Sequence, residues 1–168
     1  SGVNYTIYFC LLSKQFKEAF SIEEVRWYFV IILVSALTIA WNVRPLYATL
    51  GETLRHSFFQ VGTIITTTGF ATTDFNMWPQ LSKTILLLLM MIGACAGSTG
   101  GGMKVSRVLI LFKAIRKELS MMIHPRMVKK IKMDGHNLSH ETLRSTNVYM
   151  TAYFIVLFVS LLIVSLDE

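Results

Sequence analysis

The chain has 168 residues, of which 53% are hydrophobic and only 15% are charged. Soluble domains carry about 25% charged residues, so this composition indicates a membrane protein and argues against a soluble enzyme or binding domain. The two cysteines, Cys10 and Cys95, lie far apart in apolar stretches and give no support to a disulfide framework. The net charge of +6 predicts no nucleic-acid partner, because membrane topology accounts for it.

The first predicted element is a membrane-spanning helix over Trp27 to Val43. This stretch contains no charged residue and is bracketed by Arg26 and Arg44. Trp27 and Trp41 near its ends are typical of the aromatic belts at membrane interfaces. The run is therefore a short but sufficient span.

A shorter helix is predicted next, over Glu52 to Ile65, with Glu52 near the positive end of the helix dipole. At about 1.5 Å per residue the helix is about 21 Å long, too short to cross a hydrocarbon core of about 30 Å. We therefore expect a re-entrant helix that enters the membrane and turns back, with its negative C-terminal end pointing inward.

The sequence TTTGF follows this helix, and no charged residue occurs between Arg55 and Asp74. Non-helical backbone at membrane depth is tolerated only where it is buried in protein or lines water. An extended segment at this place presents successive carbonyl oxygens to a cation, and its glycine permits positive φ. We predict an ion filter made of Thr66, Thr67, Thr68, Gly69 and Phe70.

A broken membrane crossing is predicted over residues 84–115. Thr84 to Ala96 is apolar but too short to span, as is the apolar run that ends at Ile115, whereas the two together are long enough. Between them lies GSTGGG, in which three successive glycines disfavour helix by about 1 kcal/mol each relative to alanine. We expect a loop here, in which Ser98 and Thr99 satisfy freed backbone groups. A glycine-rich face for close helix packing is the alternative.

The last predicted element is a membrane-spanning helix over residues 145–168. Before it, a predicted loop over residues 117–144 and the end of the preceding helix carry an excess of basic residues, which indicates the cytoplasmic side. The basic residues are Lys113, Arg116, Lys117, Arg126, Lys129, Lys130, Lys132 and Arg144. The segment from Arg44 to Lys83 is then extracytoplasmic.

Two stretches, TTTGFATTDFNMWP and GACAGSTGGGMKVSRV, resemble the third repeat of potassium uptake proteins of the TrkH/KtrB type, in the Trk/Ktr/HKT superfamily. The resemblance covers nearly the whole chain. It implies an all-α, multi-pass protein of the bacterial inner membrane in which four repeats surround one pore. Each repeat is a helix, a re-entrant pore helix with a filter loop, and a broken helix. Residues 1–24 would be the cytoplasmic end of the preceding repeat and a linker, residues 25–116 this pore repeat, and residues 145–168 the first helix of the next.

The same resemblance implies roles for residues and partners. Gly69 corresponds to the family's filter glycine, so potassium is expected at the filter carbonyl oxygens; in HKT relatives a serine at this place goes with sodium permeation. The gate loop beneath the filter comprises Gly97, Ser98, Thr99, Gly100, Gly101 and Gly102. Expected partners are membrane lipid, the other repeats, a second copy of the full-length protein, and a cytoplasmic nucleotide-binding subunit of the TrkA/KtrA type. Nucleotide would act only through that subunit, and no covalently bound cofactor is expected.

Two basic residues, Lys104 and Arg107, follow the gate loop. Charges within the membrane are costly and normally face water or a partner, so we predict that both face the inner vestibule or the gate loop. Extension toward the cytoplasmic interface is the alternative. The spacing of Gly97 and Gly102 does not indicate a phosphate-binding loop, because Met103 and Lys104 follow where Lys and then Ser or Thr are required.

The cytoplasmic segment contains two further patterns. His136 and His140 have a spacing that can grip a metal, but only Glu141 accompanies them, so a solvated loop is favoured. Val128 to Gly135 reads partly as a short strand that ends in an Asp-Gly turn. This stretch is either a docking place for the regulatory subunit or an ordinary cytoplasmic loop.

No pairing of nucleophile and base, metal cluster or pair of catalytic carboxylates is evident in the sequence, so we predict a potassium-translocating protein and not an enzyme. Two alternatives remain open. One is a homotetrameric two-helix potassium channel subunit, and the other is a non-conducting membrane scaffold subunit.

Overall fold

The computed structural model describes residues 2–15, 21–124 and 131–166. Parts of the predicted segments 1–24, 117–144 and 145–168 lie outside these residues, including Arg126, Lys129 and Lys130 of the basic segment and residues 128–130 of the predicted strand. The chain divides into two compact units, Ser1–Ser106 and Arg107–Glu168. The described chain is helical apart from its loops and one small hairpin, so the predicted all-α fold class is confirmed.

The first unit begins with α1 (Tyr5–Leu12), a short helix whose N-cap is Asn4. The Asn4 side chain accepts a hydrogen bond from the backbone N–H of Thr6 at 2.9 Å. Ile7 and Cys10 of α1 pack against Val25 in a small buried cluster. This contact attaches the N-terminal segment to the first long helix.

That long helix, α3 (Glu23–Val43), begins earlier than the predicted start at Trp27 and ends in the 3-10 turn η1 (Arg44–Leu46). The prediction was wrong at this end because it followed the charge-free run. Glu23 and Glu24 lie in the first turn, where the positive end of the helix dipole stabilises carboxylates. By length and composition, the helical segment Glu23–Leu46 is able to cross a membrane.

The pore helix of the prediction is α4 (Leu50–Ile65), which starts slightly before Glu52. Its N-cap is Thr49, whose hydroxyl accepts a hydrogen bond from the N–H of Glu52 at 3.2 Å. Threonine at the N-cap with glutamate three residues later is a known start signal for helices. The polar face of this amphipathic helix includes Thr53, Ser57 and Gln60, all of which are buried.

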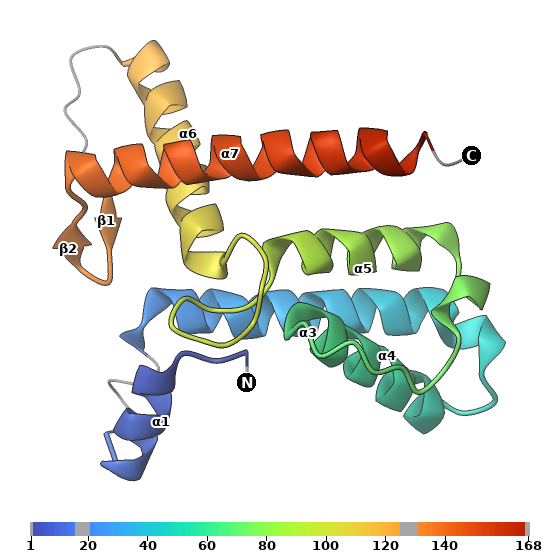
Figure 1. Ribbon diagram of the computed structural model, residues 1–168. Coiled ribbons are helices and arrows are strands. Elements are labelled where there is room, and N and C mark those ends of the chain that lie inside the picture. The colour runs from blue at the N-terminus through green and yellow to red at the C-terminus, as the bar shows by residue number, and fades with distance from the viewer. Residues whose placement is uncertain (1, 16–20, 125–130, 167–168) are drawn as a thin grey trace. The chain divides into compact units, whose positions relative to one another are not determined.

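After the 3-10 turn η2 (Phe75–Met77), α5 (Gln80–Ile92) forms the first half of the predicted broken helix and starts before Thr84. The start at Thr84 was wrong because Pro79, which needs no N–H partner at a helix start, precedes the helix directly. In Figure 1, α3 and α5 run side by side, and α4 packs against both. The core between these three helices is made of Ala36, Ile39, Val43, Val61, Ile65, Leu86 and Leu89.

The second unit contains most of α6 (Val105–Ile123), the strands β1 (Lys132–Met133) and β2 (His136–Asn137), and α7 (His140–Val164). The prediction of a loop over residues 117–144 was wrong at both ends, because residues 117–123 belong to α6 and residues 140–144 to α7. Charge marks the side of the membrane but does not end a helix, since Lys, Arg and Glu are good helix formers. The Ser139 hydroxyl caps α7 by accepting from the N–H of Thr142 at 3.1 Å.

The two strands form an antiparallel hairpin with Lys132 opposite Asn137. Asp134 and Gly135 at its turn have φ values of 50° and 80°, as a two-residue hairpin turn requires. The predicted Asp-Gly turn is therefore confirmed. His136 lies in β2 and His140 at the start of α7.

Two helices of the described chain, Glu23–Leu46 and His140–Val164, are long and apolar enough to span a membrane. α5 is apolar but has only 13 residues. α6 has 19 residues and carries basic side chains from Arg107 onward. The pairing of α5 and α6 into one broken crossing therefore stays a prediction.

Candidate functional site

The filter segment, residues 66–70, follows directly from the C-terminal end of α4, and one residue of that helix holds it. The carbonyl oxygen of Thr63 accepts hydrogen bonds from the N–H groups of Thr68 at 2.9 Å and Gly69 at 3.4 Å. The Thr63 hydroxyl accepts a third, from the N–H of Phe70 at 2.9 Å. Sequence analysis missed Thr63, because it reads as an ordinary residue of an amphipathic helix.

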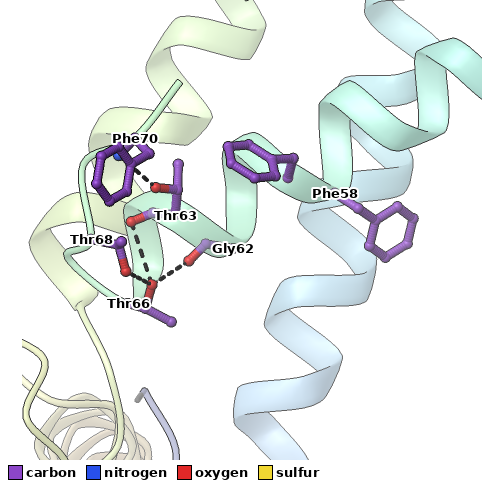
Figure 2. Close-up of a pocket in the computed structure, with 7 residues that line it drawn as sticks. Phe58, Gly62, Thr63, Thr66, Thr68 and Phe70 are labelled. Carbon is purple, nitrogen blue, oxygen red and sulfur yellow. Dashed lines mark hydrogen bonds between the residues drawn. The ribbon is translucent and has the colours of Figure 1, made fainter. Parts of the chain in front are cut away.

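The threonine hydroxyls reinforce this turn, as Figure 2 shows. The Thr66 hydroxyl donates to the carbonyl oxygen of Gly62 at 2.6 Å and lies 2.7 Å from the hydroxyl oxygen of Thr68. Thr67 and Gly69 have φ values of 55° and 83°, so the chain reverses through two left-handed positions. A glycine such as Gly69 adopts a left-handed conformation without cost, whereas the same conformation strains Thr67.

The arrangement leaves the carbonyl oxygens of the filter segment available. All five of its N–H groups are bound to residues of α4. Among the residues that the structure describes, no backbone N–H donates to a carbonyl oxygen of residues 66–70. Carbonyl oxygens are the groups that replace water around a desolvated cation, so this geometry fits cation coordination.

A pocket of about 460 Å³ lies beside the filter segment (Figure 2). Its lining residues are Phe58, Phe59, Gly62, Thr63, Thr66, Thr68 and Phe70. Aromatic rings dominate this lining, and the threonine hydroxyls are largely used within the turn. The pocket is therefore a space next to the filter segment and not itself a site for an ion.

Polar and aromatic side chains fix the chain beyond the filter. The Trp78 indole N–H donates to the Tyr47 hydroxyl at 3.1 Å, and this hydroxyl lies 3.4 Å from that of Thr73. His56 of α4 stacks on Tyr47, and its Nδ1 lies 3.0 Å from the Thr72 hydroxyl. The predicted extracytoplasmic end of the filter is thus tied to α4 and to the turn after α3. Sequence analysis gave no signal for these contacts, which join residues far apart in the chain.

The interhelical loop, residues 93–104, is wider than the predicted gate loop that it contains. Backbone hydrogen bonds join its two ends, from the N–H of Met103 to the carbonyl oxygen of Met91 and from the N–H of Lys104 to that of Ile92, both at 3.0 Å. The two ends of the interhelical loop are therefore bonded to each other, and the loop is closed.

Two glycines permit the closure of this loop. Gly93 and Gly102 have φ values of 72° and 83° and lie against each other. A Cβ on Gly102 would lie 2.7 Å from the Cα of Gly93, which is closer than side chains approach backbone. Gly102 belongs to the predicted gate loop, whereas Gly93 lies outside it and was not predicted. At both positions a close approach of two backbones requires glycine.

The gate loop lies against the start of the filter segment. The N–H of Gly101 donates to the Thr67 hydroxyl at 3.0 Å. A Cβ on Gly100 would lie 3.5 Å from the carbonyl oxygen of Thr66. The structure thus brings together the two stretches that the sequence singled out, although 34 positions separate Thr67 from Gly101.

Lys104 turns toward the gate loop. Its ammonium group donates to the carbonyl oxygens of Gly100 and, at 3.5 Å, of Ser98. The Ser98 hydroxyl in turn donates to the carbonyl oxygen of Cys95 at 2.6 Å, a local bond of the kind expected for this residue. Of the two alternatives for Lys104, contact with the gate loop is therefore the one observed.

Arg107 belongs to the second unit, where its guanidinium carbon lies 4.0 Å from the centre of the Tyr149 ring. This distance is typical of a cation–π contact. A role of Arg107 in the vestibule stays a prediction.

The chain is similar to known cation transport proteins. The family model "TrkH: Cation transport protein" matches residues 11–168. The chain is 36% identical over 167 residues to the Trk system potassium uptake protein TrkH of Escherichia coli strain K12, and 41% identical over 115 residues to TrkH of Vibrio parahaemolyticus. These alignments cover 96% and 67% of this chain.

The crystal structure of the potassium transporter TrkH from Vibrio parahaemolyticus is similar to this fold, with a TM-score of 0.88 and 32% identity over 96% of this chain. The chain covers 34% of the Escherichia coli relative and 36% of the crystallised chain, so it spans about a third of the length of these proteins. The relatives are transport proteins by name, and the resemblance that the two motifs carry is confirmed. The chain belongs to the TrkH family of cation transport proteins.

Proposed function

We propose that this chain is one pore-lining repeat, followed by the first helix of the next repeat, of a protein that translocates potassium across the bacterial cytoplasmic membrane. The observation that carries the proposal is the filter segment. Bonds to Thr63 and its helix occupy its N–H groups, and within the described part of the chain its five carbonyl oxygens accept from no backbone N–H. The names of the relatives, potassium uptake proteins, support potassium as the ion.

The gate loop supplies a barrier on the same path. It contacts the filter segment through Gly101 and Thr67. Backbone bonds from Met103 and Lys104 to the end of α5 close the interhelical loop that contains it. We propose that this loop obstructs the pore when closed and that potassium passes when it moves aside. Lys104, which is bonded to two carbonyl oxygens of the loop, would stabilise the closed form.

One repeat does not enclose a pore, so we propose that three further repeats of the full-length protein complete it. The proposed partners are a second copy of the full-length protein, membrane lipid, and a cytoplasmic nucleotide-binding subunit of the TrkA/KtrA type. The words "Trk system" in the names of the relatives support the existence of further components. The exposed apolar side chains along α7, such as Phe158 and Leu162, support lipid or another repeat as its surroundings.

We expect the full-length protein to restore growth at low potassium in bacteria that lack their own potassium uptake, because the filter replaces the hydration shell of the ion. The measurement is potassium uptake in these cells, compared with the empty vector. Absence of uptake at normal protein levels in the membrane would favour the scaffold alternative. A gene that encodes a single filter-like segment, in place of four, would favour the homotetrameric channel.

The proposed topology predicts which residues face the outside. A cysteine at Asp74 or Asn76, both exposed and next to η2, is expected to react in intact cells with a membrane-impermeant thiol reagent. A cysteine at Asp134, in the turn of the hairpin, is expected to react only after the cells are opened. The native protein is the control, since Cys10 and Cys95 are buried. The reverse labelling pattern would overturn the orientation.

A further inference from the structure

We propose that Glu24 is a positioning residue that holds the gate loop closed, and that regulated opening of the pore must break one of its hydrogen bonds. This inference rests on the proposed function and assigns part of the regulation of the same site. Glu24 belongs neither to the filter segment nor to the gate loop.

Glu24 lies in the first turn of α3 and is only 4% exposed. One of its oxygens, Oε1, accepts two backbone hydrogen bonds, from the N–H of Ala96 at 2.6 Å and from the N–H of Ser106 at 3.0 Å. The two donors are 72 and 82 positions away in the chain. Burial of a carboxylate is costly unless hydrogen-bond donors contact it, and these two N–H groups supply such donors to Glu24.

The two donors lie on opposite sides of the gate loop. Ala96 immediately precedes the loop, whereas Ser106 lies in the first turn of α6, which follows it. A single oxygen atom of α3 therefore joins the entry of the gate loop to the start of the next helix. The negative charge also lies at the positive end of the α6 dipole, where it stabilises the helix start.

Backbone bonds also join the two sides of the gate loop directly, as from the N–H of Val105 to the carbonyl oxygen of Ala94 at 3.1 Å, whereas the contacts with the N-terminal segment hold one side. The N–H of Cys95 donates to the carbonyl oxygen of Gly2 at 3.0 Å, and the N–H of Tyr5 donates to that of Gly97 at 3.2 Å. These bonds attach residues 95–97 to the N-terminal segment. Lys104 bonds within the interhelical loop itself. Glu24 is thus the side chain through which α3 binds both sides.

The two hydrogen bonds to Glu24 resist opening of the gate loop. Any movement that separates the first turn of α6 from residue 96 must break one of the two bonds to Glu24. Hydrogen bonds to a charged acceptor are about twice as strong as those between neutral groups. The pair of bonds therefore favours the closed loop, and a regulatory subunit that opens the pore must overcome it.

The test uses the full-length protein with two substitutions of Glu24. Glu24→Met keeps most of the side-chain volume but removes the acceptor, whereas Glu24→Gln keeps an acceptor oxygen in the same place. The matched control is Glu23→Met, which alters the neighbouring, more exposed carboxylate of the same turn. Two quantities are measured for each variant: potassium uptake with and without the regulatory subunit, and the rate at which a cysteine at Ser98 reacts with a small thiol reagent.

We expect Glu24→Met to raise both the uptake without the subunit and the labelling rate at residue 98 by about tenfold, the shift that loss of a hydrogen bond to a charged group produces. Glu24→Gln is expected to restore most of the dependence on the subunit, and Glu23→Met to behave like the parent. A Glu24→Met variant that keeps the parent labelling rate and full dependence on the subunit would overturn the proposal.

Two further outcomes are also decisive. If both Glu24 variants merely lower the amount of protein in the membrane, and glutamine gives no rescue, Glu24 has only a structural role and the proposal is wrong. If the parent protein takes up no potassium, the proposed function fails, yet the labelling rate at residue 98 still decides whether Glu24 holds the loop. The two failures are therefore distinguishable.

Discussion

Replacement of Gly102 by alanine in the full-length protein is expected to raise potassium uptake in the absence of the regulatory subunit by about thirtyfold or more. Gly102 has a φ of 83°, a conformation that costs an alanine about 1–2 kcal/mol. The added Cβ would also lie 2.7 Å from the Cα and 2.9 Å from the N of Gly93, which are backbone atoms that cannot turn away. Alanine further favours helix over loop by about 1 kcal/mol. All three effects destabilise the closed loop, and about 2 kcal/mol suffices for the expected shift.

Gly101→Ala is the matched control for this prediction. Its Cβ would meet only the Thr67 side chain at 3.6 Å, an ordinary contact, and Gly101 does not lie in the left-handed region. The measurement is potassium uptake with and without the subunit at equal amounts of protein in the membrane. Equal regulation in the two variants would show that the loop is a packing feature and that the gate lies elsewhere.

Replacement of Gly69 by serine is expected to lower the preference for potassium over sodium by about tenfold. Gly69 has a φ of 83°, and a Cβ there would meet no atom within 4 Å, so the substitution causes strain but no collision. The strain of about 1–2 kcal/mol drives the residue toward negative φ and turns the neighbouring carbonyl oxygens away from the ion. The measurement is uptake of the two ions by the full-length protein under matched conditions.

Gly135→Ser provides a control with the same local strain. Gly135 has a φ of 80°, and a Cβ added to it would also meet no atom within 4 Å, but it lies in the turn between β1 and β2. A serine there is expected to leave the preference between the two ions unchanged. If both variants, or neither, alter that preference, the assignment of Gly69 to the filter is wrong.

Local sequence predicted where the helices lie but not where they end. The charge-free run from Trp27 located α3, yet the helix starts at Glu23, because the helix dipole accommodates carboxylates in the first turn. The basic residues that predict the cytoplasmic side did not end α6, which continues to Ile123, because Lys, Arg and Glu are good helix formers. Helix ends depend on capping bonds and on the dipole, which a count of apolar residues does not register.

The sequence by itself predicts the class of the protein, the order of its helices and the two stretches that form the proposed site. Composition and length predict the membrane class and the helices, because a helix must be long and apolar enough to cross about 30 Å of hydrocarbon. Glycines predict the two loops, because a sharp reversal of the chain favours residues that tolerate positive φ. The Asp-Gly turn of the hairpin was equally readable, since positive φ at two successive positions selects these residues.

How the two stretches are held became visible only in the folded chain. Thr63 orients the filter segment, Thr67 meets Gly101, and Glu24 binds both sides of the gate loop, and the last two contacts join residues 34 to 82 positions apart. Lys104 turns to the loop for a related reason, because the loop closes on itself and presents carbonyl oxygens within reach of the ammonium group. Such partners are chosen by the packing of α3, α4 and α5 against one another, and local propensity contains no information about that packing.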